Sequence, residues 1–115
     1  MPKPKKYTIR VRFWVDETSG PFLGIGRVLL LEQIKITGSI TGAAKELKMS
    51  YRQAWQLVSD MNKCSDKPLV EKQLGGSAGG GAFLTPAGEV AIKQFYKIDK
   101  QLKAFAEKLN AQTKL

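Results

Sequence analysis

Residues 38–62 read GSITGAAKELKMSYRQAWQLVSDMN, and this stretch decides the fold. Ser39 and Ser50 each stand directly before a segment whose apolar residues have helical spacing. A serine at such a position can accept hydrogen bonds from the unpaired amides of the first helical turn. Lys48 and Met49 leave room only for a sharp turn between the two segments. The stretch therefore predicts two helices joined by a tight turn, a helix-turn-helix at residues 39–63.

The second of these helices has an apolar stripe and a polar surface. Ala54, Val58 and Met61 are spaced by four and then three residues, which predicts the buried stripe. The polar residues near its N-terminal half are Tyr51, Arg52, Gln53 and Gln56. Arginine can contact guanine through two hydrogen bonds, and glutamine can do the same with adenine. We interpret Arg52, Gln53 and Gln56 as base-reading residues, although two packed helices with solvated polar faces would show the same pattern.

Trp55 lies beside the apolar stripe of that helix, next to Ala54 and one turn before Val58. A tryptophan there could stack on a base or pack inside the protein. Its spacing from Val58 favours packing. We therefore expect a core or hinge-packing role and leave Trp55 out of the predicted contacts with nucleic acid.

Composition limits the classes of function. The chain has 115 residues, enough for one domain, and a formal net charge of +9 with a pI of about 9.8. A polyanion is a natural partner, and DNA, RNA, anionic lipid or an acidic protein would each satisfy the charge. Basic residues from Lys3 to Arg12 precede the first acid at Asp16. They can form an arm that touches phosphates, or residues 1–6 can be a disordered, solubilising basic tail.

Catalysis and metal binding are disfavoured by what the sequence lacks. It contains no histidine and a single cysteine, Cys64, which excludes a histidine-based triad, a zinc finger and an internal disulfide. No paired carboxylates stand at motif spacing. We expect no enzyme activity, no cofactor and no metal. No apolar stretch approaches the roughly 20 residues of a membrane span, so we expect a cytoplasmic protein without a membrane partner.

Alternating apolar residues at 7–15 predict an edge strand, broken by Ser19-Gly20-Pro21. An apolar helix follows the glycines at 24 and 26 and stops at Gly38. After Pro68, residues 69–74 and 83–85 predict two short strands around a glycine-rich loop. This loop lacks the Lys-Ser/Thr pair of a nucleotide-binding P-loop, so it is either a plain hairpin tip or a DNA contact. We expect a mainly α fold with a small β component, a winged helix-turn-helix whose wing spans residues 69–85.

The last predicted helix, residues 86–112, carries a heptad pattern. Thr85 suits its N-cap and Pro86 its first turn. Its apolar residues are spaced by alternating fours and threes: Ala91, Phe95, Ile98, Leu102, Phe105 and Leu109. The stripe could pack on its own domain, but a helix this long outruns a small core. We therefore interpret it as a dimerisation helix, which would present two reading helices to the half-sites of a pseudo-palindromic operator.

Several of these segments together resemble a known family. The sharpest features are Ser50-Tyr51, Ala54-Trp55 and Met61-Asn62, then the glycines at 75, 76 and 79–81 followed by Leu84-Thr85. Over roughly residues 24 to 110 the sequence resembles the N-terminal domain of the ModE family of molybdate-responsive transcriptional regulators, which is also similar to that of LysR-type regulators. The resemblance implies operator binding through the second helix, and a dimer formed through the N-terminal segment and helices outside the reading head.

The sequence departs from the pattern of full-length ModE proteins in one respect. The sequence stops at Leu115, where a molybdate-binding domain would follow, so we expect no molybdate site in this chain, whether it is a stand-alone member or a truncated one.

The candidates for contacts with backbone phosphates are Thr41, Ser50, Tyr51 and Lys63, with Lys72 and Ser77 at or near the wing.

The sequence is consistent with two functions. The first is a sequence-specific, dimeric regulator that binds double-stranded DNA, in which phosphate contacts supply affinity and the second helix supplies discrimination. The alternative is a protein-interaction or dimerisation module that has a winged-helix shape and binds nucleic acid only non-specifically.

Overall fold

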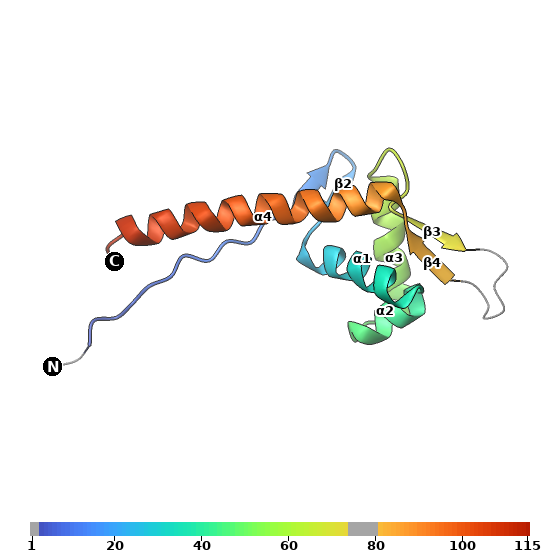
Figure 1. The fold of residues 1–115 in the computed structure, drawn as a ribbon, viewed down its shortest axis with the longest axis horizontal. Helices are drawn as coiled ribbons and strands as arrows, with labels where there is room; N and C mark the ends of the chain where they lie inside the picture. Colours follow the sequence, from blue (N-terminus) through green and yellow to red (C-terminus); the bar gives the residue numbers. More distant parts are fainter. Residues whose placement is uncertain (1–2, 74–80) are drawn as a thin grey trace.

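A computed structural model describes residues 3–73 and 81–115 (Figure 1). Four helices and two hairpins follow one another along the chain: β1 (Val15–Glu17), β2 (Gly20–Leu23), α1 (Ile25–Thr37), α2 (Ile40–Glu46), α3 (Tyr51–Lys63), β3 (Val70–Gln73), β4 (Gly81–Leu84) and α4 (Pro86–Gln112). The first three helices and the second hairpin gather at one end of the long α4 (Figure 1). The predicted fold class, a winged helix-turn-helix, is confirmed.

The core lies between α1 and the elements packed around it. Val28, Leu30, Leu31 and Ile34 of α1 are fully buried, as the apolar run of this helix predicts. The helix ends at Gly38, which has φ 73° and ψ 15°. Such a left-handed residue closes a helix at little cost when it is glycine. The expected stop at Gly38 is confirmed.

Both predicted caps of the helix-turn-helix are present. The Ser39 hydroxyl accepts a hydrogen bond from the Gly42 amide at 2.8 Å, and the Ser50 hydroxyl accepts one from the Gln53 amide at 3.0 Å. Ala43 and Ala44 of α2 are buried, because their small side chains allow close packing against neighbouring helices. Lys48 takes a positive φ of 56° in the turn between α2 and α3. The start of each helix and the turn between them are therefore determined by residues within this segment.

The hairpin β3–β4 corresponds to the predicted wing. Its strands pair antiparallel, from Val70 opposite Leu84 to Gln73 opposite Gly81. Leu69, which we expected in the first strand, precedes it; Leu74 and most of the glycine-rich loop lie outside the described residues. The Ala82 amide donates to the carbonyl of Gly38 at 2.9 Å, and this bond joins β4 to the turn between α1 and α2.

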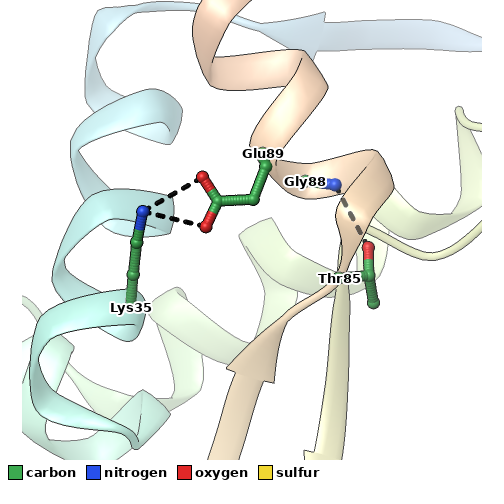
Figure 2. Close-up of polar contacts among 4 residues, drawn as sticks. All are labelled: Lys35, Thr85, Gly88 and Glu89. Atoms are coloured by element: carbon green, nitrogen blue, oxygen red, sulfur yellow. Dashed lines mark hydrogen bonds and ion pairs between the residues drawn. The ribbon is translucent and has the colours of Figure 1, made fainter.

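The N-cap of α4 also links this helix to the wing. The Thr85 amide donates to the Leu69 carbonyl at 2.9 Å, and its hydroxyl donates to the Pro68 carbonyl at 2.6 Å. The same hydroxyl accepts a hydrogen bond from the Gly88 amide at 3.1 Å (Figure 2). Thr85 is only 7% exposed, so these bonds form inside the protein. The predicted start of the last helix, with Thr85 as cap and Pro86 in the first turn, is confirmed.

The strand expected at residues 7–15 was wrong. Of these residues only Val15 belongs to a strand, and Ser19-Gly20-Pro21 forms the turn and start of a small hairpin instead of a break. Residues 9–13 lie along α4, from Asn110 near its end to Phe95 near its middle (Figure 1). The alternation itself holds, because Ile9, Val11 and Phe13 are half-buried while their neighbours are exposed.

Contacts with α4 replace the missing strand pairing. The Ile9 amide donates to Oδ1 of Asn110 at 2.6 Å. The ring of Phe13 stacks on that of Phe95, with centroids 4.5 Å apart and planes 18° apart. The alternation of apolar and polar residues therefore indicated an extended segment with one apolar side. That side packs on a helix, and the segment pairs with no other strand among the residues that the structure describes.

Candidate nucleic-acid interface

Helix α3 turns one side inward and leaves the opposite side to solvent. Ala54, Val58 and Met61 are buried, with exposed fractions of 0%, 6% and 0%, so the predicted inward stripe is confirmed. The exposed residues of this helix include Tyr51, Arg52, Gln53, Gln56 and Lys63. A helix anchored by its apolar stripe and carrying long polar side chains outward can be inserted into a groove of a polyanion.

The predicted base-reading residues lie together. Arg52, Gln53 and Gln56 line one shallow depression with Ser50 and Leu57. The side-chain amide of Gln56 donates to Oδ1 of Asp60 at 2.9 Å, so one of its donors is engaged within the helix. Arg52 and Gln53 remain exposed; the arginine can donate hydrogen bonds at base edges, and the glutamine can both donate and accept them.

The predicted phosphate-contacting residues are more dispersed. Thr41 is exposed on α2, and Tyr51 is 48% exposed at the start of α3. Lys63 at the end of α3 and Lys72 in β3 line a second groove, between α3 and the wing. Ser77 lies outside the described residues. The chain thus offers hydroxyl and cationic donors on three elements around the exposed side of α3.

Trp55 does not pack in the core, contrary to our expectation. Its side chain is 42% exposed and forms one wall of the groove that Lys63 and Lys72 also line. The Lys72 Nζ lies 6.0 Å from the centre of the indole ring. The physical reason is helical geometry: one residue along a helix is a rotation of about 100°. Trp55 is therefore turned away from the stripe that contains Ala54.

Asn62 has a positioning role that the sequence did not indicate. Its side-chain oxygen accepts hydrogen bonds from the Leu69 amide at 2.8 Å and the Val70 amide at 3.3 Å. Its side-chain NH₂ donates to the Val70 carbonyl at 3.0 Å. Asn62 thereby fixes the first residues of the wing against the last turn of α3. In the sequence, Asn62 stood out only as part of the Met61-Asn62 pair that resembles the ModE family, and this resemblance did not indicate what its side chain does.

The residues predicted for dimerisation divide between buried and exposed positions. Ala91 and Phe95 are 7% and 2% exposed, and Phe95 contacts Phe13 of its own chain. Leu102 and Leu109 are half-buried, whereas Ile98 and Phe105 are 39% and 61% exposed. The N-terminal part of the stripe thus packs within its own chain, and the distal part presents apolar side chains to solvent.

Within residues 3–73 and 81–115, no helix has the length and apolar character needed to cross a membrane. The same residues contain no group of three or more histidine, cysteine or acidic side chains placed to hold a metal ion.

Several known proteins are similar in sequence to this chain. The chain is 45% identical over 100 residues to the molybdenum-pterin-binding protein MopB of Rhodobacter capsulatus, an alignment that covers 84% of this chain and 37% of MopB. It is 48% identical over 69 residues to the transcriptional regulator ModE of Yersinia pestis, covering 60% of this chain and 26% of that protein.

A third relative is the DNA-binding transcriptional dual regulator ModE of Escherichia coli (strain K12), which is 43% identical over 81 residues, 69% of this chain and 30% of the relative. The chain thus spans less than two fifths of the length of these three relatives. The resemblance to the helix-turn-helix domain of the ModE family is confirmed. Residues 26–89, from α1 through the wing to the start of α4, match the family described as bacterial regulatory helix-turn-helix proteins of the lysR type, and the chain belongs to this family.

Proposed function

We propose that this chain binds double-stranded DNA sequence-specifically as part of a dimeric transcriptional regulator of the ModE type, acting in the cytoplasm. The observation that carries the proposal is the exposed cluster of Arg52, Gln53 and Gln56 on a helix whose other side is anchored in the core. The Escherichia coli relative is a DNA-binding transcriptional regulator, which supports the same assignment. The proposal gives this part of the chain no molybdate site and no catalytic role.

In this proposal the contacts divide by chemistry. Arg52, Gln53 and Gln56 contact base edges in the major groove, because their side chains can form paired hydrogen bonds there. The contacts with backbone phosphates come from Thr41, Ser50, Tyr51, Lys63, Lys72 and Ser77. Phosphate contacts position the protein and supply affinity that depends on salt, whereas base contacts distinguish sequences.

The distal part of α4 supports the dimeric form of the proposal. The helix has 27 residues and is therefore about 40 Å long. Ile98 and Phe105, two turns apart on one flank, are both exposed. Residues of the N-terminal segment cover the flank that contains Asn110, so the apolar flank beside it remains available to a second copy. Exposed apolar side chains gathered on one flank of a helix are typical of an association surface.

Selection of bound duplexes from a random library, followed by fluorescence anisotropy with the enriched sequence, tests DNA recognition. The Arg52→Ala substitution should cost about 1 to 3 kcal/mol on the enriched duplex and relax the preference for one base. Lys100→Ala is the control, since it removes an exposed positive charge from α4. Equal weakening on enriched and random duplexes would assign Arg52 to a phosphate. No binding at low salt, or no enriched sequence, would overturn the proposal.

Analytical ultracentrifugation tests the dimer separately. The chain should sediment as a dimer at micromolar concentration, and Phe105→Lys should convert it to a monomer, because a charge on the apolar flank must be desolvated for the copies to associate. Lys108→Ala, a change at a neighbouring exposed position, serves as the control. A parent protein that sediments as a monomer would contradict the dimeric form.

A further inference from the structure

The groove between α3 and the wing has a feature that base reading by Arg52, Gln53 and Gln56 does not explain. It has a volume of about 340 Å³, with apolar walls that include Trp55, Val58 and Val70. Trp55 is the large exposed side chain among them, at 42%. Covering the exposed part of this ring with a ligand removes apolar surface from water, which is favourable.

The charges at this groove have one sign. Lys63 approaches it from the end of α3 and Lys72 from β3, and the described residues that line it include no carboxylate. Glu71 lies on the opposite face of its strand from Val70 and Lys72, because successive side chains of a strand alternate. Asp60 accepts a hydrogen bond from Gln56, which lines the depression that contains Arg52 and Gln53. A negatively charged ligand would therefore meet two cations and no opposing charge.

The walls of the groove indicate what kind of anion fits. A small inorganic anion would satisfy the two lysines and leave the indole ring exposed. A deoxyribose-phosphate strand carries charged groups separated by apolar sugar and base surface, so it can satisfy both. The groove also shares a helix with the proposed reading residues, because Trp55, Ser59 and Lys63 of α3 line it.

We infer that this groove holds one strand of the bound DNA, with the Trp55 ring packed against a deoxyribose and Lys63 and Lys72 contacting the phosphates on either side of that sugar. The inference rests on the proposed function and assigns it an additional contact. It also assigns Asn62 an indirect role, since the hydrogen bonds of Asn62 to Leu69 and Val70 hold the two walls of the groove together. Sugar and phosphate are common to all sequences, so Trp55 contributes affinity without discrimination.

The contact can be measured directly by fluorescence. The chain contains two tryptophans, Trp14 and Trp55, and Trp14→Phe leaves Trp55 as the only indole. In this variant, saturation with the enriched duplex should reduce quenching of Trp55 by acrylamide, because the strand covers the ring. Thymidine monophosphate at the same phosphate concentration should not. Unchanged quenching with bound duplex, or equal protection by the mononucleotide, would overturn the inference.

Affinity gives a second readout that separates Trp55 from Arg52. Trp55→Ala should weaken binding about tenfold on enriched and random duplexes alike, a loss equivalent to burial of part of one aromatic side chain. Trp55→Phe should restore most of the affinity, and it also guards against misfolding of the alanine variant. Lys72→Gln should lower the slope of log affinity against log salt by about 1. Lys100→Gln, on α4, should leave this slope unchanged.

The outcomes distinguish the two proposals. If Arg52→Ala weakens binding to the enriched duplex while both Trp55 variants bind like the parent, the reading helix is correct and the groove is not a DNA contact. If Trp55→Ala relaxes sequence preference in place of lowering general affinity, the ring contacts a base and the assignment to deoxyribose is wrong. If the parent binds no duplex, both the proposed function and this inference fall.

Discussion

The two halves of α4 carry the same spacing of apolar side chains in different surroundings. In the half nearest the wing, Ala91 and Phe95 are 7% and 2% exposed, and the helix is tied to α1 and β3. In the distal half, Ile98 and Phe105 are 39% and 61% exposed. The spacing therefore determines which side chains share a face, whereas the elements that happen to lie opposite determine whether that face is covered.

The difference separates two energetic roles for one helix. Burial of the first half contributes to the folding of the single chain, because its apolar surface is removed from water within that chain. The second half keeps apolar surface exposed, apart from the flank that contacts the N-terminal segment. In the proposed dimer, its contribution depends on a second copy and on protein concentration. The two halves should therefore respond differently when an apolar side chain is truncated.

The largest difference should appear between Phe95→Ala and Phe105→Ala. Phe95 is 2% exposed and stacks on Phe13, so its truncation leaves a cavity and should cost about 3 to 5 kcal/mol of unfolding free energy. Phe105→Ala removes a side chain that is 61% exposed and should cost less than about 1 kcal/mol in the monomer. Urea denaturation at low protein concentration measures both values. Equal losses would show that α4 is packed uniformly along its length.

The contact between α4 and the wing should be the next most sensitive feature. Gly88 is buried, and a methyl group there would collide with the Leu69 carbonyl oxygen and lie 2.6 Å from Cδ1 of Leu84. Since backbone cannot move aside easily, Gly88→Ala should destabilise the protein by about 1 to 3 kcal/mol.

Gly26→Ala is the matched control for this glycine. Gly26 lies in the first turn of α1, where an added methyl group meets no atom within 4 Å. Alanine has the higher helix propensity, so this variant should be up to about 1 kcal/mol more stable. A Gly88→Ala protein as stable as Gly26→Ala would mean that the wing yields to the added methyl group, and α4 would then be less firmly fixed at this end than its burial indicates.

The proximal half of α4 and the helix-turn-helix could be predicted because their signals are local. Ser39, Ser50 and Thr85 cap helices by bonds to amides three residues away, and Gly38 supplies a left-handed conformation within its own backbone. Each signal is complete within a few residues of sequence. The order of the helices and the position of the wing follow from these signals.

The features that the sequence did not reveal depend on contacts between distant segments. Ile9 bonds to Asn110 across 101 positions, so a period of two could not distinguish a strand from an extended segment on a helix. The exposure of Trp55 follows from its angle around α3 together with the position of β3. Asn62 binds backbone atoms of the wing seven and eight residues further along the chain. Its role becomes visible only when both elements are in place.

A smaller effect, with a defined pH dependence, concerns the bond between α4 and α1. The Tyr96 hydroxyl donates to Oε1 of Glu32 at 2.6 Å. Burial, together with this bond and the negative charge of Glu32, raises the pKa of Tyr96 to about 12 from an ordinary value of 10.0. Loss of the bond in Tyr96→Phe should cost about 0.5 to 1.5 kcal/mol at pH 8.

The sign of the pH dependence follows from the raised pKa. Above pH 10 the unfolded chain loses the tyrosine proton first, so the contribution of Tyr96 to stability is present below pH 10 and is lost as the pH rises towards 12. The difference in unfolding free energy between the parent and Tyr96→Phe should shrink over this interval. Comparing the two proteins cancels the titration of the lysines. A difference that stays constant from pH 8 to pH 12 would contradict the assigned bond.

The smallest effect should come from the ion pairs, and here the two halves of α4 should behave alike. In the proximal half, Lys35 Nζ lies 2.9 Å from Oε1 of Glu89 (Figure 2), with exposed fractions of 57% and 39% for the two side chains. In the distal half, Lys103 and Asp99 form a pair at 2.9 Å within the helix. Exposed pairs of this kind contribute about 0 to 1 kcal/mol, because water and salt screen them.

Double-mutant cycles with Lys35→Met and Glu89→Gln, and with Lys103→Met and Asp99→Asn, measure the two coupling energies separately from the effect of Glu89 on the helix N-terminus. Both couplings should be below about 0.5 kcal/mol and should decrease further in 1 M salt. If the Lys35–Glu89 coupling were several times larger than the other, electrostatics would help to fix the proximal half. Equal, small couplings would mean that the burial of apolar side chains, and not electrostatics, distinguishes the two halves of α4. The proximal half packs within its own chain, whereas the distal half leaves apolar side chains exposed.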